Sequence, residues 1–114
     1  MGRVSDDVVE AQVDAYNLCD LAAFAACSSP DVVIEHGAGA ALMRGRGEIE
    51  TQYGPFFESS PHVHAEIVTR IRVREYVVDE EHVIGVAGVE SGEVRAVAIY
   101  HVAGGLIDRL RILQ

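Results

Sequence analysis

The chain has 114 residues, 49% of them hydrophobic, and 18 acidic against nine basic side chains give it a net charge of -9. This charge repels a phosphate backbone, so we expect no nucleic-acid partner. All nine basic residues are arginine, which excludes an imine-forming lysine and a phosphate-loop lysine. The length predicts one domain, spanning residues 1–114.

The first residues lack the apolar core of an export signal, and no apolar run approaches the roughly 18 residues of a membrane span. We therefore expect a cytoplasmic protein with no membrane partner. Cys19 and Cys27 have no CxxC spacing. In that compartment they are expected to be reduced, buried thiols.

Two helices are predicted before any strand. Ser5, followed by two aspartates, can cap the first helix, and Asp20 can cap a second, short helix that Pro30 stops. A third helix should follow Gly47, with Tyr53 on its inner stripe and a kink or break at Gly54-Pro55.

Residues 31–36 alternate, with Asp31, Val33 and Glu35 on one face. We expect that charged face to meet water, so His36 should point to the interior. Further strands are predicted at 63–73, 76–89 and 94–102, with a last strand after the turn at 103–105. Helices followed by hairpin-connected strands predict an α+β protein with helices on one face of a strongly curved sheet.

The strand at 94–102 is apolar on both faces, which is typical of a strand that is covered on both sides. One face can line the inside of the curved sheet. The other face, with Val97, Ile99 and His101, needs a second cover. In so short a chain we expect that cover to be a second copy, which predicts a homodimer.

Four motifs follow one another along the chain: Tyr16-Asn17-x-x-Asp20-Leu21-x-x-Phe24, Pro30-Asp31-Val32, Gly45-Arg46-x-x-Ile49 and Tyr100-x-Val102-x-x-Gly105-x-Ile107. Their order and spacing resemble the nuclear transport factor 2-like superfamily, in its SnoaL-like and ketosteroid-isomerase-like branch. The resemblance covers almost the whole chain. It implies a cone-shaped α+β fold, in which three N-terminal helices pack on a strongly curved antiparallel or mixed sheet that encloses a pocket. It also implies a homodimer through the outer sheet face.

The ketosteroid isomerases to which the chain is similar hold a carboxylate base on the first strand, a phenol on the first helix and a protonated acid on the penultimate strand. Aligned by motif, these positions fall on His36, Gln12 and Ala98. Two of the three groups are lost, so we do not expect that oxyanion hole. Hydroxyls of Tyr53 or Tyr100 could replace the missing donors if they reach the cavity.

His36 is the candidate base, since an imidazole exchanges protons near neutral pH. The resemblance suggests that Glu80 and His82 also face the cavity, where the three side chains could relay a proton. Alternation leaves this open, because the opposite face carries Asp79 and Glu81 in its middle and is otherwise just as apolar, with Val77, Val83, Ala87 and Val89. In the alternative, His36 bonds a backbone carbonyl, while Glu80 and His82 form a charged patch at a rim or dimer edge.

The same three side chains could surround a metal, but the superfamily's cavity usually works without one. We therefore predict neither a metal nor a cofactor. The expected ligand is small and largely apolar. The expected lining comprises Gln12, Tyr16, Val32, Ile34, Tyr53, Ile84, Ala98, Tyr100, Leu110 and Ile112.

The leading function is cofactor-independent acid/base chemistry of isomerase or polyketide-cyclase type on an enolisable carbonyl compound. The alternative is a non-catalytic module for small-molecule binding or dimerisation.

Overall fold

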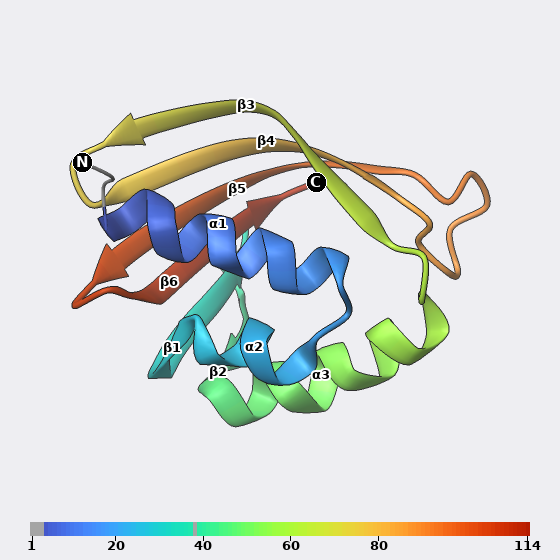
Figure 1. Ribbon diagram of the computed structural model, residues 1–114, viewed down its shortest axis with the longest axis horizontal. Helices are drawn as coiled ribbons and strands as arrows, with labels where there is room; N and C mark the ends of the chain where they lie inside the picture. Colours follow the sequence, from blue (N-terminus) through green and yellow to red (C-terminus); the bar gives the residue numbers. More distant parts are fainter. Residues whose placement is uncertain (1–3, 38) are drawn as a thin grey trace.

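Three helices lie on one side of a single curved sheet in the computed structural model, which describes residues 4–37 and 39–114 (Figure 1). This arrangement confirms the predicted α+β class with its helices over one face of a curved sheet. The elements are α1 (Val4–Asn17), α2 (Leu21–Ala26), β1 (Ser28–His36), β2 (Ala41–Arg44), α3 (Arg46–Ser59), β3 (His64–Val73), β4 (Tyr76–Ile84), β5 (Val94–Ala103) and β6 (Leu106–Leu113).

The six strands have the order β2-β1-β6-β5-β4-β3. Strands β3 to β6 form the predicted antiparallel meander, and β6 then pairs in parallel with β1. The sheet is therefore mixed. Helix α1 contacts β3, β4, β5 and β6, whereas α3 contacts β1 and β2. The helices thus cover the concave face from one end of the sheet to the other (Figure 1).

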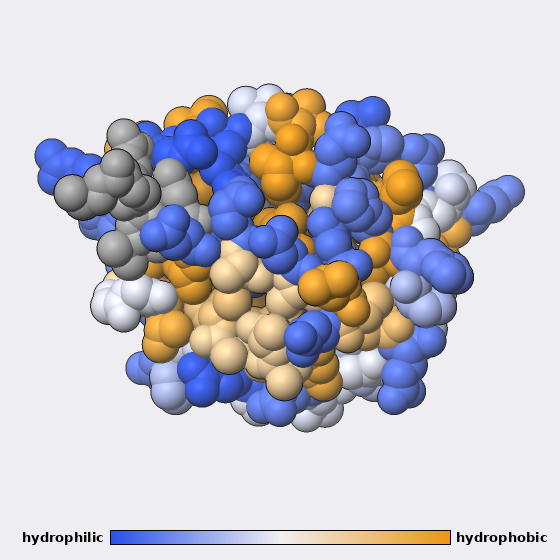
Figure 2. All heavy atoms as spheres, viewed as in Figure 1, coloured by the Kyte–Doolittle hydropathy of each residue, from blue (hydrophilic) through white to orange (hydrophobic). Residues whose placement is uncertain are grey.

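Local sequence explains where the helices begin and end. The Ala23 N–H donates to the Asp20 carboxylate at 3.1 Å, which caps α2 as predicted. Pro55 lies inside α3, which continues to Ser59, so the expected break at Gly54-Pro55 is wrong. The alanines Ala22, Ala23 and Ala26 of α2 are exposed, and pale orange surface in the middle of Figure 2 marks moderately hydrophobic residues on this face.

Strand β4 ends at Ile84, five residues before the predicted end at Val89. Gly85 follows the last residue of the strand with φ +75°, and a Cβ atom placed on it would collide with the backbone of His62, so the position requires glycine. The β5–β6 turn uses Gly104 and Gly105, with φ +60° and +78°, as a two-residue hairpin loop requires.

Residues Ala96, Ala98, Tyr100 and Val102 of β5 are buried beneath the helices. The alternate residues of β5 lie on the outer, convex face and are partly buried there. Within the described residues, no helix is long and apolar enough to cross a membrane.

Both cysteines are free thiols. Cys27 is buried, and burial raises the pKa of its thiol. Cys19 is partly exposed, which corrects the expectation that both thiols are buried. The reason is its place in the turn between α1 and α2, where its φ is +53°.

Candidate acid–base and ligand-binding site

A cavity of about 300 Å³ lies between the helices and the concave face of the sheet. Its helical wall carries three side chains of α1, one of α2 and three of α3: Gln12, Val13, Tyr16, Phe24, Gln52, Tyr53 and Phe56. The opposite wall comes mainly from the four meander strands: Ala65, Glu81, Val83, Val94, Ala96, Ala98, Tyr100, Leu110 and Ile112. Met43 of β2, Val86 and Gln114 complete the lining. The cavity is thus mainly apolar, with a few polar groups, as ligand sites usually are.

Four aromatic rings of the helical wall pack against one another. The ring centroids of Phe24 and Tyr53 are 4.7 Å apart, and those of Tyr16 and Phe56 are 6.0 Å apart. Tyr16 and Tyr53 also meet edge to face at 6.5 Å. These contacts join the four rings into one surface, and the term aromatic wall is used below for Tyr16, Phe24, Tyr53 and Phe56.

Glu81 is the carboxyl group of the cavity. It pairs with Ala96 of β5 and lies on the same face of β4 as Asp79 and Val83, so strand alternation directs its side chain inward. Burial, followed by the charge of Asp79, raises its pKa from 4.5 to about 7. The hydrogen bond with Tyr100 and the charge of Arg70 oppose this rise. Near neutral pH, Glu81 can therefore both accept and give a proton.

The Tyr100 hydroxyl lies 3.4 Å from Glu81 Oε2 and 3.4 Å from Gln12 Oε1. Both distances are long for O–H···O bonds, and one hydroxyl proton serves only one acceptor at a time. Burial, with the negative charge of Glu81, raises the pKa of Tyr100 well above its ordinary value. Tyr100 thus stays a neutral donor beside the carboxyl group.

A buried ion pair supports this end of the site. Arg70 donates from Nε to Asp79 Oδ1 at 2.6 Å and from its terminal nitrogen to Oδ2 at 2.8 Å. It also donates to Glu10 of α1. Asp79 is fully buried, so the two-bond geometry compensates its charge. The pair ties β3 to β4 and to α1 directly beside Glu81.

The structure places seven of the ten expected ligand-binding residues around the cavity: Gln12, Tyr16, Tyr53, Ala98, Tyr100, Leu110 and Ile112. Val32 and Ile34 lie in the core but are not among the lining residues. Ile84 is 45% exposed at the end of β4, because alternation turns it to the convex face. These three positions are corrections to the expected pocket.

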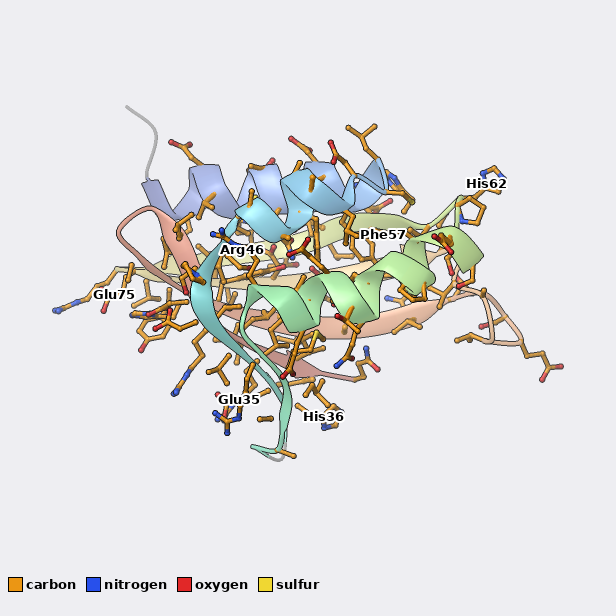
Figure 3. The ribbon with its side chains drawn as sticks, turned by 90° about the horizontal axis from the view of Figure 1, so that it is seen from below. Glu35, His36, Arg46, Phe57, His62 and Glu75 are labelled. Atoms are coloured by element: carbon orange, nitrogen blue, oxygen red, sulfur yellow. The ribbon has the colours of Figure 1, made fainter. Side chains whose placement is uncertain are left out.

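The structure does not bring His36, Glu80 and His82 together. His36 lies exposed at the end of β1, near the β1–β2 turn (Figure 3), and it is not among the residues that line the cavity. Glu80 is exposed on the convex face. His82, on that same face, lies 2.7 Å from Glu93 Oε1 through its Nε2 atom. The expected proton relay is therefore wrong.

Glu81 is the ionisable residue of the cavity that sequence reasoning missed. The sequence does contain a sign of this residue: the middle of the strand is polar on both faces, with Asp79 and Glu81 on one face and Glu80 and His82 on the other. Among the described residues, no group of three or more His, Cys, Asp or Glu side chains is arranged to hold a metal ion. The carboxyl group of Glu81 and the hydroxyl of Tyr100 give the cavity a group that can exchange a proton beside a hydrogen-bond donor.

The family model of the SnoaL-like domain matches residues 9–110 of the chain. The search of curated protein sequences found no match to this chain. Among solved structures, a cystatin-fold protein from Novosphingobium aromaticivorans is similar, with a TM-score of 0.88, 23% identity and coverage of 99% of this chain and 100% of the other.

Two further structures show the same fold. A provisionally named polyketide cyclase from Sinorhizobium meliloti has a TM-score of 0.79, 22% identity and coverage of 97% and 99%. A protein with a ketosteroid isomerase-like fold from Catenulispora acidiphila, in complex with trimethylamine, has a TM-score of 0.78, 20% identity and coverage of 93% and 83%.

Proposed function

Because the chain belongs to the SnoaL-like domain family, we propose that it binds a small, largely apolar ligand and transfers protons to and from it through Glu81. The chemistry is of isomerase or cyclase type, on a compound with an enolisable carbonyl. One observation carries the proposal: the cavity contains a carboxyl group whose pKa is raised to about 7. A general base is most effective when its pKa lies near the working pH.

In the proposed reaction, ionised Glu81 takes a proton from the carbon next to the ligand carbonyl. The electron pair of that C–H bond moves toward the carbonyl oxygen, which becomes an enolate. The Tyr100 hydroxyl lies 3.4 Å from Glu81 Oε2, so a ligand bound beside Glu81 is also near this donor. Tyr100 then donates a hydrogen bond to the enolate oxygen. Protonated Glu81 then returns the proton to a carbon of the ligand, which restores the carboxylate.

The test is solvent-deuterium incorporation into 2-indanone, a compact enolisable ketone. We expect the wild type to accelerate exchange above the buffer rate. Glu81→Gln should lose about 100-fold to 10,000-fold of that acceleration, the usual contribution of general acid–base catalysis. Glu80→Gln is the matched control, because its side chain lies exposed on the convex face of the same strand. Equal exchange in Glu81→Gln and wild type would remove Glu81 from the mechanism.

Ligand binding without turnover is the second candidate function. The similar protein from Catenulispora acidiphila, which is a complex with trimethylamine, supports small-molecule binding by this fold. Binding of a pocket ligand with no exchange above the buffer rate would favour this candidate.

A further inference from the structure

The cavity has a negative group and lacks a positive one. Among the described residues that line it, Glu81 is the one carboxyl group, and none is Arg or His. Arg70 and Arg72 of β3 lie on the same face of the sheet, opposite Asp79 and Val77, but neither is among the residues that line the cavity. Asp79 binds Arg70 through two hydrogen bonds and Glu10 binds it through a third. A ligand that ionises Glu81 must therefore bring its own positive charge.

The aromatic wall lines the same cavity as Glu81. The face of an aromatic ring carries negative electrostatic potential and attracts cations. Burial chiefly raises the pKa of Tyr53, to about 12, and the charge of Glu81 adds to the rise. The charge of Glu81 contributes to the raised pKa of Tyr16 as well, after burial and Tyr53. The carboxylate and the two rings thus act on one another electrostatically.

We propose that the ligand of this cavity is a compact amine, protonated or quaternary, whose cationic nitrogen lies between Glu81 and the aromatic wall. The rings replace part of the water around the cation, and Glu81 provides its counter-charge. The net charge of -9 also favours the approach of a cation over that of an anion.

This inference rests on the proposed function only in placing the polar part of the ligand against Glu81. An ammonium group near Glu81 favours the carboxylate form, which is the form that takes a proton from carbon. The substrate class is therefore a small amine that also carries the enolisable carbonyl. A neutral apolar ketone of the same size would be a poorer ligand.

The experiment compares a cation with its neutral isostere. The probes are (2-hydroxyethyl)trimethylammonium and 3,3-dimethylbutan-1-ol, which have the same shape and differ in charge. Two-dimensional NMR at pH 8 measures both affinities. We expect the wild type to bind the cation about tenfold more tightly or better, the ratio that cation–π attraction and a carboxylate partner supply.

Glu81→Gln should lose most of the preference for the cation, because it keeps the shape of the side chain and loses its charge, and only the attraction of the aromatic wall remains. Tyr53→Leu should weaken the cation more than the alcohol. Glu80→Gln should keep the wild-type ratio, since its carboxylate lies exposed on the convex face. Amide spectra of each variant verify that it is folded.

Equal binding of the two probes by the wild type would overturn the proposal. So would a preference for the cation that is as large in Glu81→Gln as in the wild type. Either result would leave the deuterium-exchange test of Glu81 unaffected, because that test uses a neutral ketone. Conversely, cation preference with no exchange into either 2-indanone or 1-(dimethylamino)propan-2-one, an amine that carries an enolisable carbonyl, would support the amine ligand and contradict the acid–base chemistry.

Discussion

At the scale of single residues, the raised pKa of Glu81 makes the free energy of unfolding depend on pH. The pKa rises from 4.5 to about 7 on folding, so the folded protein binds the proton more tightly than the unfolded chain. Stability should therefore fall as pH increases from about 4.5 to about 7. Above pH 7 the ionised carboxylate costs on the order of 3 kcal/mol.

Replacing Glu81 with Gln removes this cost and keeps an acceptor for the Tyr100 hydroxyl. We expect Glu81→Gln to be about 1–3 kcal/mol more stable than the wild type at pH 8 and nearly equal to it at pH 4. Urea unfolding at the two pH values measures the difference. Glu80→Gln should show no such pH-dependent gain. A Glu81→Gln protein that gains nothing between pH 4 and pH 8 would contradict the raised pKa.

The site residues divide by how well a sequence pattern can reveal them. Tyr16, Tyr53 and Tyr100 lie on apolar stripes, and periodicity alone directs them inward. Sequence reasoning missed Glu81 because each face of its strand carries both polar and apolar residues, so alternation does not tell which face points inward. The face of such a strand is set by its register with its neighbour, here Glu81 opposite Ala96. The loop at 85–93 is too long for turn chemistry to fix that register in advance.

At the scale of elements, Gly85 ends β4 by close approach to another backbone. A Cβ atom placed there would lie 2.5 Å from the carbonyl oxygen of His62, closer than real contacts allow. Gly88 has a similar φ, +82°, yet nothing lies within 4 Å of its Cβ position. Substitutions at the two glycines therefore distinguish the cost of a positive φ from the cost of a steric clash.

We expect Gly85→Ala to destabilise the fold by about 3 kcal/mol or more, since strain at positive φ adds to a clash with backbone. Gly88→Ala should cost only about 1–2 kcal/mol, the conformational part alone. Thermal unfolding of the two variants measures the difference. Equal destabilisation would show that β4 and the segment before β3 do not approach each other so closely.

Element prediction succeeded where the signals are local. The Asp20 cap is one side-chain oxygen three residues from the amide that it satisfies, and the Gly104-Gly105 turn is a two-residue hairpin. It failed where the signal is tertiary. Pro55 does not break α3, and β4 ends at Gly85 because of a contact with residue 62. His36 continues the inward face of β1 and pairs with Ile112, but its side chain is exposed and is not among those that line the cavity.

At the scale of the whole molecule, motif order predicted the fold better than any single motif. The three helices lie on the concave side of the sheet, and the last strand, β6, returns beside β1 (Figure 1). The parallel pairing of β6 with β1 completes this arrangement. Within residues 4–37 and 39–114, no helix covers the convex face of the meander (Figure 1).

The last prediction concerns that convex face, which we expect to pair with a second copy of the chain. Several of its apolar side chains are exposed: Ile71 by 54%, Val73 by 57%, Tyr76 by 44% and Ile84 by 45%. Ile99 lies among these strands, opposite Val78 of β4. A stable homodimer buries about 1,200–2,000 Å² in total, and apolar surface on one continuous sheet face favours such an interface.

We expect the wild type to sediment as a dimer at micromolar concentration. Ile99→Arg should give a monomer or an aggregate, because two buried arginines would face each other across a two-fold axis. Leu18→Arg is the matched control: Leu18 is 77% exposed and follows α1, on the helical side of the molecule. A monomeric wild type would exclude the dimer, and an unchanged dimer in Ile99→Arg would move the interface elsewhere.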